Sequence, residues 1–356
     1  MKKYVVAILG ATGAVGQRLI SELEHSQIPV AKVKLLASKR SAGKKLTFNN
    51  QEVTVEEAQP DSFTGVDLVL SSAGGSVSKK LLPEAVKRGA VCVDNTSAFR
   101  MEEDVPLVIP GVNEQQLQYH HGIIANPNCS TIQMVAALYP VYQRWGIEQI
   151  IVSTYQAVSG AGQSAWNEML QQAQAILNKQ KPTANILPTA ADVKHYPLAF
   201  NLLPQIDVFE DDGYTHEEWK MIHETKKILC NDQDSPKIKV TATCVRVPVE
   251  IGHGESVYFV VEDKGASVPE IQAEIAKTSG LILQDKPQQQ LYPQPLTAAG
   301  KRETFVGRIR PDQENNGAFQ MWVVADNLLK GAASNTVAIA ECLVRDHLVQ
   351  VPNNKA

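Results

Sequence analysis

The first third of the chain alternates short apolar runs with amphipathic stripes. The run Tyr4–Leu9 is rich in β-branched residues and ends at a glycine, which is typical of a buried strand. Within 14–24, Val15, Leu19 and Leu23 share one apolar stripe, which predicts a helix. The same patterns predict strands over 33–37, 66–70 and 90–93 and a helix over 77–88. Strands that alternate with helices predict a parallel sheet covered by helices on both faces.

The remainder of the chain has a different pattern. A polar, glutamine-rich helix is predicted over 163–179. The segment 181–213 contains four prolines, and a loop of this length is usually functional or part of an interface. Strict alternation over 237–249 predicts a half-exposed antiparallel strand, with 256–262 as a nearby partner. The pattern closes with a predicted strand over 319–324 and an amphipathic helix over 334–347.

The composition is that of an ordinary globular protein. A length of 356 residues suggests two domains at roughly 150 residues each. The 34 Lys and Arg against 38 Asp and Glu give a net charge of −4, so the basic surplus typical of nucleic-acid-binding proteins is absent. Every apolar stretch is well short of the ~18 residues of a membrane span, so no transmembrane segment is expected.

The five cysteines are scattered along the chain without a CxxC pair. This spacing argues against a structural zinc site and a disulfide framework, and favours a cytosolic protein with reduced thiols. The N-terminal apolar run is too short for a secretory signal and leads directly into a glycine motif.

That motif, Gly10-Ala-Thr-Gly13-Ala-Val-Gly16, lies between the first predicted strand and helix. Glycine lets the backbone turn tightly and approach a pyrophosphate, and the helix N-terminus offers N–H groups and a positive dipole. The first two glycines are one residue further apart than in the common GxGxxG pattern. A plain strand-to-helix turn is the alternative, but the strand before and the helix after favour a dinucleotide site.

The choice between NAD and NADP depends on the end of the second predicted strand. NAD enzymes place an Asp or Glu there to bind the ribose 2′-hydroxyl. This chain has Ala37-Ser-Lys39-Arg40-Ser41, with two cations and no carboxylate. The segment therefore predicts a site for the 2′-phosphate of NADP.

Cys129 lies in the polar segment Ala125-Asn-Pro-Asn-Cys-Ser-Thr131, directly before a helix predicted over 132–145. A helix N-terminus favours the thiolate, and its backbone N–H groups can serve as an oxyanion site. The polar loop therefore makes Cys129 a candidate nucleophile. A buried apolar role is expected for the cysteines inside apolar runs, which are Cys92, Cys244 and Cys342.

A nucleophilic thiol needs a base, and His253 is the candidate because glycines flank it in Gly252-His-Gly-Glu-Ser256. Arg246 lies on the alternating strand just before, on the same face as Cys244. Two segments at predicted strand ends, 95–100 and 153–162, are candidate site loops because open α/β sheets bind ligands at such ends.

The motifs GATGAVG, SSAGGS, NTSAFR, ANPNCST, YQAVSGAG, EEWKM and RVPVEIGHGES occur in this order. On these motifs the sequence resembles the aspartate-β-semialdehyde dehydrogenase family over essentially its whole length. The resemblance implies a Rossmann-type NADP-binding domain over 1–128, to which 327–356 returns. It also implies an α+β catalytic and dimerisation domain over 129–326, giving an α/β protein overall that forms a dimer or tetramer in the cytoplasm.

Members of this family reduce L-aspartyl 4-phosphate with NADPH to L-aspartate 4-semialdehyde and release phosphate, for lysine, diaminopimelate, threonine, isoleucine and methionine synthesis. By match of motif, Cys129 would form an acyl thioester, His253 would be the acid/base and Gln156 would orient the thioester. Arg246 would bind the substrate α-carboxylate and Glu217 its amino group. The implied phosphate ligands are Arg100, Lys220 and Asn128. The implied NADP site comprises Gly10, Thr12, Gly13, Ala14, Val15, Gly16, Lys39, Arg40, Ser41, Ser159, Gly160 and Asn327.

The residues also fit three other functions. An N-acetyl-γ-glutamyl-phosphate reductase uses the same cysteine and histidine, but its acylated substrate would not need Glu217. A cysteine hydrolase would suit Cys129 and His253, which are 253 − 129 = 124 residues apart, but its CGSCW-type motif is missing. A non-catalytic NADP(H) sensor would use Cys129 as a redox switch. Phosphate-dependent NADP reduction separates the semialdehyde dehydrogenase from the hydrolase and the sensor.

Overall fold

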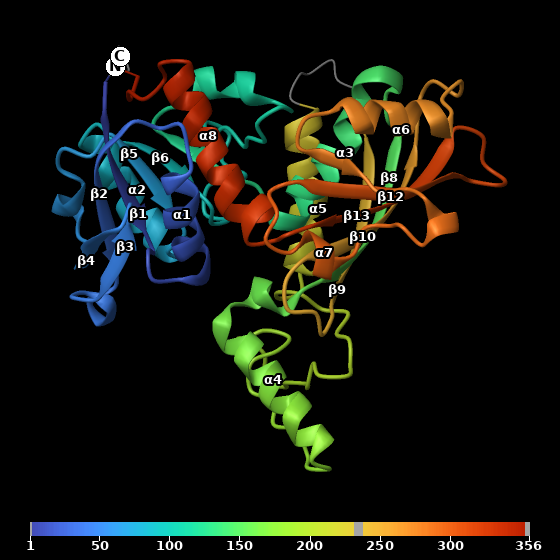
Figure 1. Cartoon of the computed structure of the whole chain (residues 1–356), viewed down its shortest axis with the longest axis horizontal. Coiled ribbons are helices and arrows are strands. Elements are labelled where there is room, and N and C mark those ends of the chain that lie inside the picture. Colours follow the sequence, from blue (N-terminus) through green and yellow to red (C-terminus); the bar gives the residue numbers. More distant parts are fainter. Residues whose placement is uncertain (1, 231–237, 353–356) are drawn as a thin grey trace. The chain divides into compact units, whose positions relative to one another are not determined.

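The computed structural model describes residues 2–230 and 238–352 and divides into two compact units (Figure 1). The first unit combines the chain up to Asn128 with the chain from Ala332 onward, and the second is the continuous stretch Cys129–Gly331. Residues 327–331, which the sequence places in the nucleotide domain, therefore belong to the second unit. The reason is local, since Asn327 Nδ2 donates to Ser159 Oγ (3.0 Å) and Gly252 N donates to Asn327 Oδ1 (2.9 Å).

Within the described residues, the first unit is built on a seven-stranded sheet. Its strands, in spatial order, are β3 (Lys45–Phe48), β4 (Gln51–Glu57), β2 (Val30–Ala37), β1 (Tyr4–Leu9), β5 (Leu68–Ser71), β6 (Val91–Asp94) and β7 (Ile123–Ala125). All neighbouring strands run parallel except the edge pair β3 and β4. The predicted parallel sheet is therefore confirmed.

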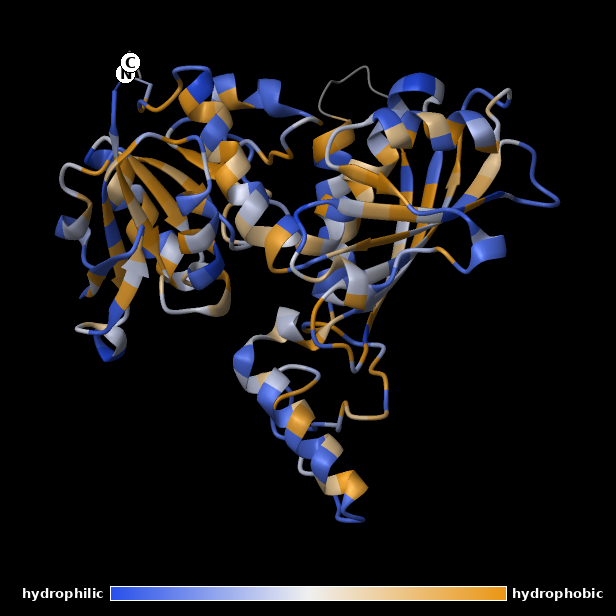
Figure 2. Cartoon of the chain, in the orientation of Figure 1, coloured by the Kyte–Doolittle hydropathy of each residue, from blue (hydrophilic) through white to orange (hydrophobic). Residues whose placement is uncertain are grey.

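Helices cover both faces of this sheet. On one face, Leu19 and Leu23 of α1 (Ala14–Glu24) share a core with Val337 and Leu343 of α8 (Ser334–Arg345). On the other face, α2 (Gly75–Lys87) buries its apolar side against the sheet. The central strands are apolar throughout, as Figure 2 shows, because neither of their faces meets water.

The second unit is built on a six-stranded sheet, counted within the described residues. Its strands, in spatial order, are β11 (Leu281–Leu283), β12 (Thr304–Pro311), β13 (Ala318–Ala325), β10 (His253–Val260), β8 (Gln149–Gln156) and β9 (Lys239–Arg246). Its helices are α3 (Cys129–Trp145), α4 (Gln163–Leu177), α5 (His216–Leu229), α6 (Val268–Lys277) and the short α7 (Pro295–Ala298). Helices α3, α5 and α6 pack along one face of the sheet.

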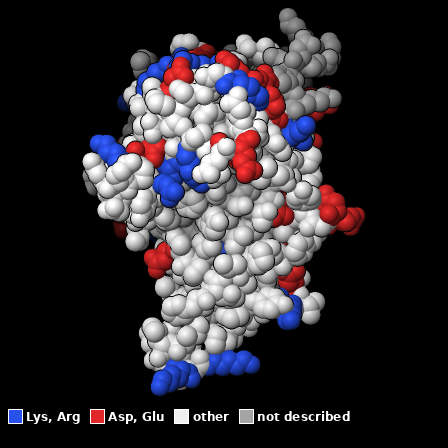
Figure 3. All heavy atoms as spheres, turned by 90° about the vertical axis from the view of Figure 1, so that its right-hand side faces the viewer, with Lys and Arg blue, Asp and Glu red and all other residues white. Residues whose placement is uncertain are grey.

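The opposite face of this sheet is covered by α7 over β12 and β13 and is partly exposed over β8. Ile151 and Tyr155 of β8 point outward and are 39% and 40% exposed, and the Tyr155 ring lies beside Trp322 of β13. The side of the second unit drawn in Figure 3 has few charged side chains across its middle. An outward face that is apolar and weakly charged is typical of an interface.

The strand predicted over 237–249 is the clearest correction. The structure has β9 at Lys239–Arg246, and it pairs in parallel with β8 rather than antiparallel with 256–262. Residue 237 lies outside the described residues. Alternation reports that one face is buried and carries no information about strand direction. The chain between β8 and β9 passes through α4 and α5, and a helical crossover of this kind joins parallel strands.

The long segment 181–213 returns along α4. Leu187, Leu198 and Leu203 pack with Met169 of α4 and with Val158 in a small core of their own. Helix α4 is polar on its other side (Figure 2). The segment is thus an irregular arm held by apolar contacts.

Candidate active site

Three buried polar side chains form one row across the second sheet. Gln156 of β8 is in register with Arg246 of β9. His253 begins β10, one residue beyond the Gly254–Tyr155 pair, and so comes beside Gln156. Because strand side chains alternate between faces, residues in one row point the same way. All three are buried, and they come from segments far apart in the sequence.

Cys129 is the first residue of α3, as predicted, and lies opposite this row. Its Sγ is 3.3 Å from His253 Nε2. On the other side of the ring, Ala157 N donates a hydrogen bond to His253 Nδ1 (3.0 Å). A nitrogen that accepts cannot also carry the proton, so the neutral ring holds its proton on Nε2, facing the sulfur. The sequence-predicted pair is therefore together, with a defined tautomer.

The same contacts disfavour a charged ring. Burial and the positive charge of Arg246, partly opposed by Glu217, together lower the pKa of His253 to about 3. An imidazolium would also need a proton on Nδ1, where the Ala157 N–H already points. His253 is therefore neutral at physiological pH.

The glycines around His253 each make room for a neighbour. A Cβ on Gly254 would lie 2.6 Å from the Trp322 ring, and Gly252 has φ +97°. A Cβ on Gly160 would lie 3.0 Å from Arg246 Nη1 and 3.5 Å from His253 Cε1. Gly160 therefore borders the arginine and the imidazole, as its place in a predicted site loop suggested.

Gln156 links α3 to α5. Its Nε2 donates to Ser130 Oγ (2.8 Å) and to Glu217 Oε1 (2.9 Å), and its Oε1 accepts from Thr154 Oγ1 (3.3 Å). Glu217 is itself 5% exposed. An amide fixed by three contacts has one orientation, so the side chain is held rigidly next to the row.

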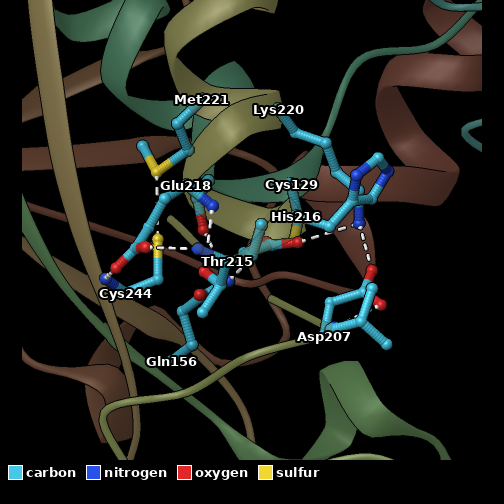
Figure 4. A network of polar contacts seen from close by, with 12 residues as sticks. Cys129, Gln156, Asp207, Thr215, His216, Glu218, Lys220, Met221 and Cys244 are labelled. Carbon is cyan, nitrogen blue, oxygen red and sulfur yellow. Dashed lines mark hydrogen bonds and ion pairs between the residues drawn. The ribbon is translucent and has the colours of Figure 1, made fainter. Parts of the chain in front are cut away.

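Helix α5 carries two acidic residues with separate roles. Glu218 closes the helix N-terminus by accepting from Thr215 N (2.7 Å), and it also accepts from Cys244 N of β9 (2.9 Å; Figure 4). Both oxygens of Glu218 thus bind backbone amides, whereas Glu217 faces Gln156. The geometry therefore distinguishes two carboxylates that are adjacent in the sequence.

Lys220 points to Asp207 from one turn further along α5. Its Nζ lies 2.9 Å from Asp207 Oδ2 and 3.2 Å from Glu217 Oε2 (Figure 4). Burial raises the pKa of Asp207, but the charge and hydrogen bond of Lys220, together with the Val208 backbone N–H, outweigh this, so that the pKa is lower than usual. Asp207 lies in the irregular arm at φ +69°, a position that no sequence signal marks.

Arg246 is fixed at both ends. Its Nη1 donates to Ala157 O (2.8 Å), and its backbone exchanges hydrogen bonds with Leu203 of the arm. Two further predicted residues lie in the first unit. Arg100 is buried and donates to the carbonyls of Asn126 (2.9 Å) and Asn95 (3.0 Å), and Asn128 is buried directly before Cys129 in the chain.

The glycine motif forms a close turn in the first unit. Gly10 has φ +88°, and a Cβ on it would lie 2.9 Å from Ala73 N. A Cβ on Gly16 would lie 2.1 Å from Gly10 O. Thr12 Oγ1 donates to Ser41 Oγ (3.3 Å), which ties the motif to the turn that follows β2. Glycine is therefore required at both positions.

A cavity of about 650 Å³ opens beside this motif, entirely within the first unit. Of the predicted cofactor residues, Gly10, Thr12, Gly13 and Lys39 line it. The lining also includes polar residues that sequence reasoning did not single out, among them Glu57, Gln59 and Lys80. Arg40 is exposed on the same turn as Lys39. Among the predicted residues of the second unit, Ser159 and Asn327 bind each other.

Comparison with known proteins identifies both units. Residues 5–120 match the family model described as semialdehyde dehydrogenase, NAD binding domain, and residues 138–330 match semialdehyde dehydrogenase, dimerisation domain. The aspartate-semialdehyde dehydrogenase of Bacillus subtilis is 57% identical over 97% of this chain and 98% of its own. That of Aquifex aeolicus is 49% identical over 97% and 99%.

Solved structures agree. The aspartate semialdehyde dehydrogenase II of Vibrio cholerae complexed with ASA has a TM-score of 0.90 at 42% identity, covering 98% of this chain and 100% of that one. The enzyme of Candida albicans with NADP has a TM-score of 0.75 at 28% identity, covering 98% and 100%. The chain therefore belongs to the aspartate-semialdehyde dehydrogenase family.

Proposed function

We propose that the protein is an NADP-dependent aspartate-semialdehyde dehydrogenase, which converts L-aspartyl 4-phosphate to L-aspartate 4-semialdehyde and phosphate in amino-acid biosynthesis. The observation that carries the proposal is the contact of 3.3 Å between Cys129 Sγ, at a helix start, and His253 Nε2. A thiol in this position can be acylated by an activated acyl donor, and an acyl phosphate is one.

The first unit fits the cofactor. Gly10 and Gly16 leave no space for a Cβ, so the backbone is free to approach a pyrophosphate. Lys39 and Lys80 supply positive charge to the cavity next to the motif, which suits a 2′-phosphate. When bound, NADPH supplies the hydride that reduces the acyl group.

The chain's own residues carry the acyl transfer. The Cys129 thiolate attacks the acyl carbon, the bond to the phosphate oxygen breaks, and a thioester forms with release of phosphate. After reduction of the thioester carbon, the C–S bond breaks and returns the thiolate with the aldehyde. His253 donates a hydrogen bond from Nε2, first to the thiolate and then to the oxygen that becomes negative, because its proton is already on that nitrogen.

Substrate recognition uses the fixed charges of the same row. A guanidinium binds a carboxylate through two parallel hydrogen bonds, so Arg246 would bind the α-carboxylate. Glu217 would bind the α-ammonium group, and Gln156, held by Ser130 and Glu217, would orient the thioester. Lys220 and Arg100, with Asn128, would bind the phosphate. The cofactor would also contact Ser159, Gly160 and Asn327.

The protein acts as a homodimer, as the match of its second unit to a dimerisation domain and the outward apolar face of β8 support. In the described residues, no helix is long and apolar enough to cross a membrane. We place the enzyme in the cytoplasm, which fits five cysteines that form no disulfide with one another.

The test is NADPH formation from aspartate semialdehyde with and without phosphate. We expect turnover only with phosphate, and turnover that ignores phosphate would contradict the proposal. N-acetyl-γ-glutamyl-phosphate reductase is the second candidate, but the buried Glu217 favours a cationic amine. The acetylated, one-carbon-longer analogue should therefore be a poor substrate.

A further inference from the structure

A second contact lies directly behind the catalytic pair. Cys129 and Gln133 are four residues apart on α3, which is a rise of about 6 Å on one helix face. His253 and Glu255 are two residues apart on β10, which is about 6.8 Å on one strand face. The two spacings are nearly equal. Gln133 and Glu255 therefore lie next to each other, just beyond the contact between Cys129 and His253.

Both residues of this second contact are buried. Glu255 is 0% exposed and Gln133 is 1% exposed. Gln133 Nε2 donates to the carbonyl of His253 (3.2 Å), so the helix is tied to the strand exactly where the imidazole is attached. The Gln133 side chain thus reaches the face of β10 that also carries Glu255. The pair therefore helps to fix the position of the His253 backbone, and with it the position of the imidazole.

The hydrogen-bond arrangement of the pair lacks one donor. Among the described residues, neither oxygen of Glu255 has a hydrogen-bond partner, and neither does Gln133 Oε1. These are acceptors only, if Glu255 is ionised. A single proton on Glu255 turns one of its oxygens into a donor for Gln133 Oε1, which leaves only the second Glu255 oxygen without a partner among the described residues.

We propose that Glu255 is a neutral carboxylic acid that donates a hydrogen bond to Gln133 Oε1, and that this pair is a positioning device holding His253 against Cys129. The proposal rests on the proposed function, since it assigns the pair a role in that reaction. In the part of the chain that the structure describes, Glu255 forms no hydrogen bond with the sulfur or the imidazole, so it acts through Gln133 and the β10 backbone.

A neutral Glu255 is consistent with the burial and the charges of its surroundings. Burial raises the pKa of Glu255 well above its usual value, and the Gln133 contact only partly opposes this. The titratable and charged groups of the surrounding elements are Cys129 of α3, Cys244 and Arg246 of β9, His253 of β10, and Glu217 and Glu218 of α5. An ionised Glu255 would add a third buried carboxylate to this set, whereas a neutral one adds none.

The experiment compares Glu255→Gln with Glu255→Ala in the full-length enzyme. The amide of Glu255→Gln can still donate to Gln133 Oε1, so we expect kcat within about threefold of wild type. Glu255→Ala removes the donor, and a catalytic group displaced by about 1 Å can cost about 10²-fold in kcat. We expect that loss in kcat, with little change in KM for NADPH. Val323→Ala, which empties a buried site next to Glu255 in the same row, is the control for loss of packing.

Two readouts need no turnover. Iodoacetamide should alkylate Cys129 at nearly the wild-type rate in Glu255→Gln and more slowly in Glu255→Ala. The infrared difference spectrum of wild type minus Glu255→Gln should contain the C=O band of a protonated carboxyl group at neutral pH. Equal losses in the two variants, or carboxylate bands instead of the C=O band, would overturn the proposal. Failure of the proposed function would instead abolish wild-type turnover and leave both readouts intact.

Discussion

His253 is the residue whose position and protonation state matter most for the chemistry of the site. It is fully buried between a backbone N–H, which binds Nδ1, and the Cys129 sulfur, which faces Nε2. With Nδ1 accepting and the proton on Nε2, the neutral ring is a donor toward the sulfur and has no nitrogen free to take the thiol proton. This tautomer does not support the predicted role of His253 as the base. The free enzyme is therefore ready to stabilise negative charge on sulfur or oxygen.

A neutral buried histidine makes stability depend on pH. His253 has a pKa of about 3 in the folded protein and about 6.5 when unfolded, so the unfolded chain binds the proton first as pH falls. Its stabilising contribution is complete above pH 6.5 and is lost between about 6.5 and 3, by up to about 1.4 kcal/mol per pH unit. His253→Asn should lose stability less steeply over this range. Urea unfolding at a series of pH values measures this.

The exposed His121 provides the matched control, since His121→Asn should leave the slope unchanged. If His253→Asn has the wild-type slope, His253 is charged in the folded protein, and the tautomer assigned from Ala157 is wrong.

The sequence allowed the prediction of those site residues that lie in recognisable motifs, and of no others. It placed Cys129 at a helix start and paired it with His253, and the structure brings the two together. Asp207 and Ser130 were missed, because each contributes through a contact with a residue distant in the chain rather than through a local pattern. The roles of the individual residues in the reaction remain predictions.

At the scale of elements, the site is the meeting of one helix start with one row of strand side chains. A further element, the π-helix Leu329–Ala333, packs against Cys129 at the start of α3. A Cβ on its Gly331 would lie 2.5 Å from Cys129 Cβ and 3.1 Å from Cys129 Cα. The absence of a side chain at Gly331 therefore sets where the nucleophile can sit.

Gly331→Ala should displace Cys129. A shift of about 1 Å can cost about 10²-fold in rate, so we expect kcat to fall by that order while NADP binding in the first unit persists. Steady-state kinetics and cofactor titration measure the two effects. The control is Gly265→Ala, where a Cβ would meet only the Asp263 carboxylate on a turn of the second unit, at 3.1 Å. Unchanged kcat in Gly331→Ala would mean that α3 and the π-helix can separate without effect on catalysis.

Helices and strands were predicted correctly where the apolar residues follow a single clear pattern along the segment. Tyr4–Leu9 and Ala14–Glu24 have the predicted bounds, because a fully buried strand and an amphipathic helix each leave a clear pattern. The direction of β9 was predicted wrongly, and β12 and α6 were not predicted. For the two strands, pairing depends on which distant strand lies alongside, and no local pattern records that. Helix α6 does have a local pattern, with Ile271 and Ile275 on its buried side, and this pattern was overlooked.

At the scale of the molecule, the two predicted tasks fall in separate units. The cavity beside the glycine motif belongs to the first unit, and the Cys129–His253 contact belongs to the second. A substitution in the first unit can therefore be tested for an effect on the reactivity of Cys129, and a substitution in the second unit for an effect on NADP binding.

Lys80→Ala applies this test. Lys80 lines the cavity from α2, so its removal should weaken NADP binding by about 10-fold, equal to about 1.4 kcal/mol, with a smaller effect on NAD. The rate at which iodoacetamide alkylates Cys129 should not change. Lys87, at the end of the same helix and paired with Glu84, is the matched control, and Lys87→Ala should leave both cofactors unaffected. An equal loss for NAD and NADP would assign Lys80 to the part of the site that the two cofactors share.

The division of the chain also has a consequence for biosynthesis. The first unit is interrupted, since its core joins Leu19 and Leu23 near the start of the chain to Val337 and Leu343 near its end. The second unit, Cys129–Gly331, is continuous and complete before α8 leaves the ribosome. Domains made of one continuous stretch can fold during synthesis, whereas contacts across the whole chain must wait. The unit with the nucleophile is thus able to fold first, and the nucleotide unit only after α8 has been synthesised.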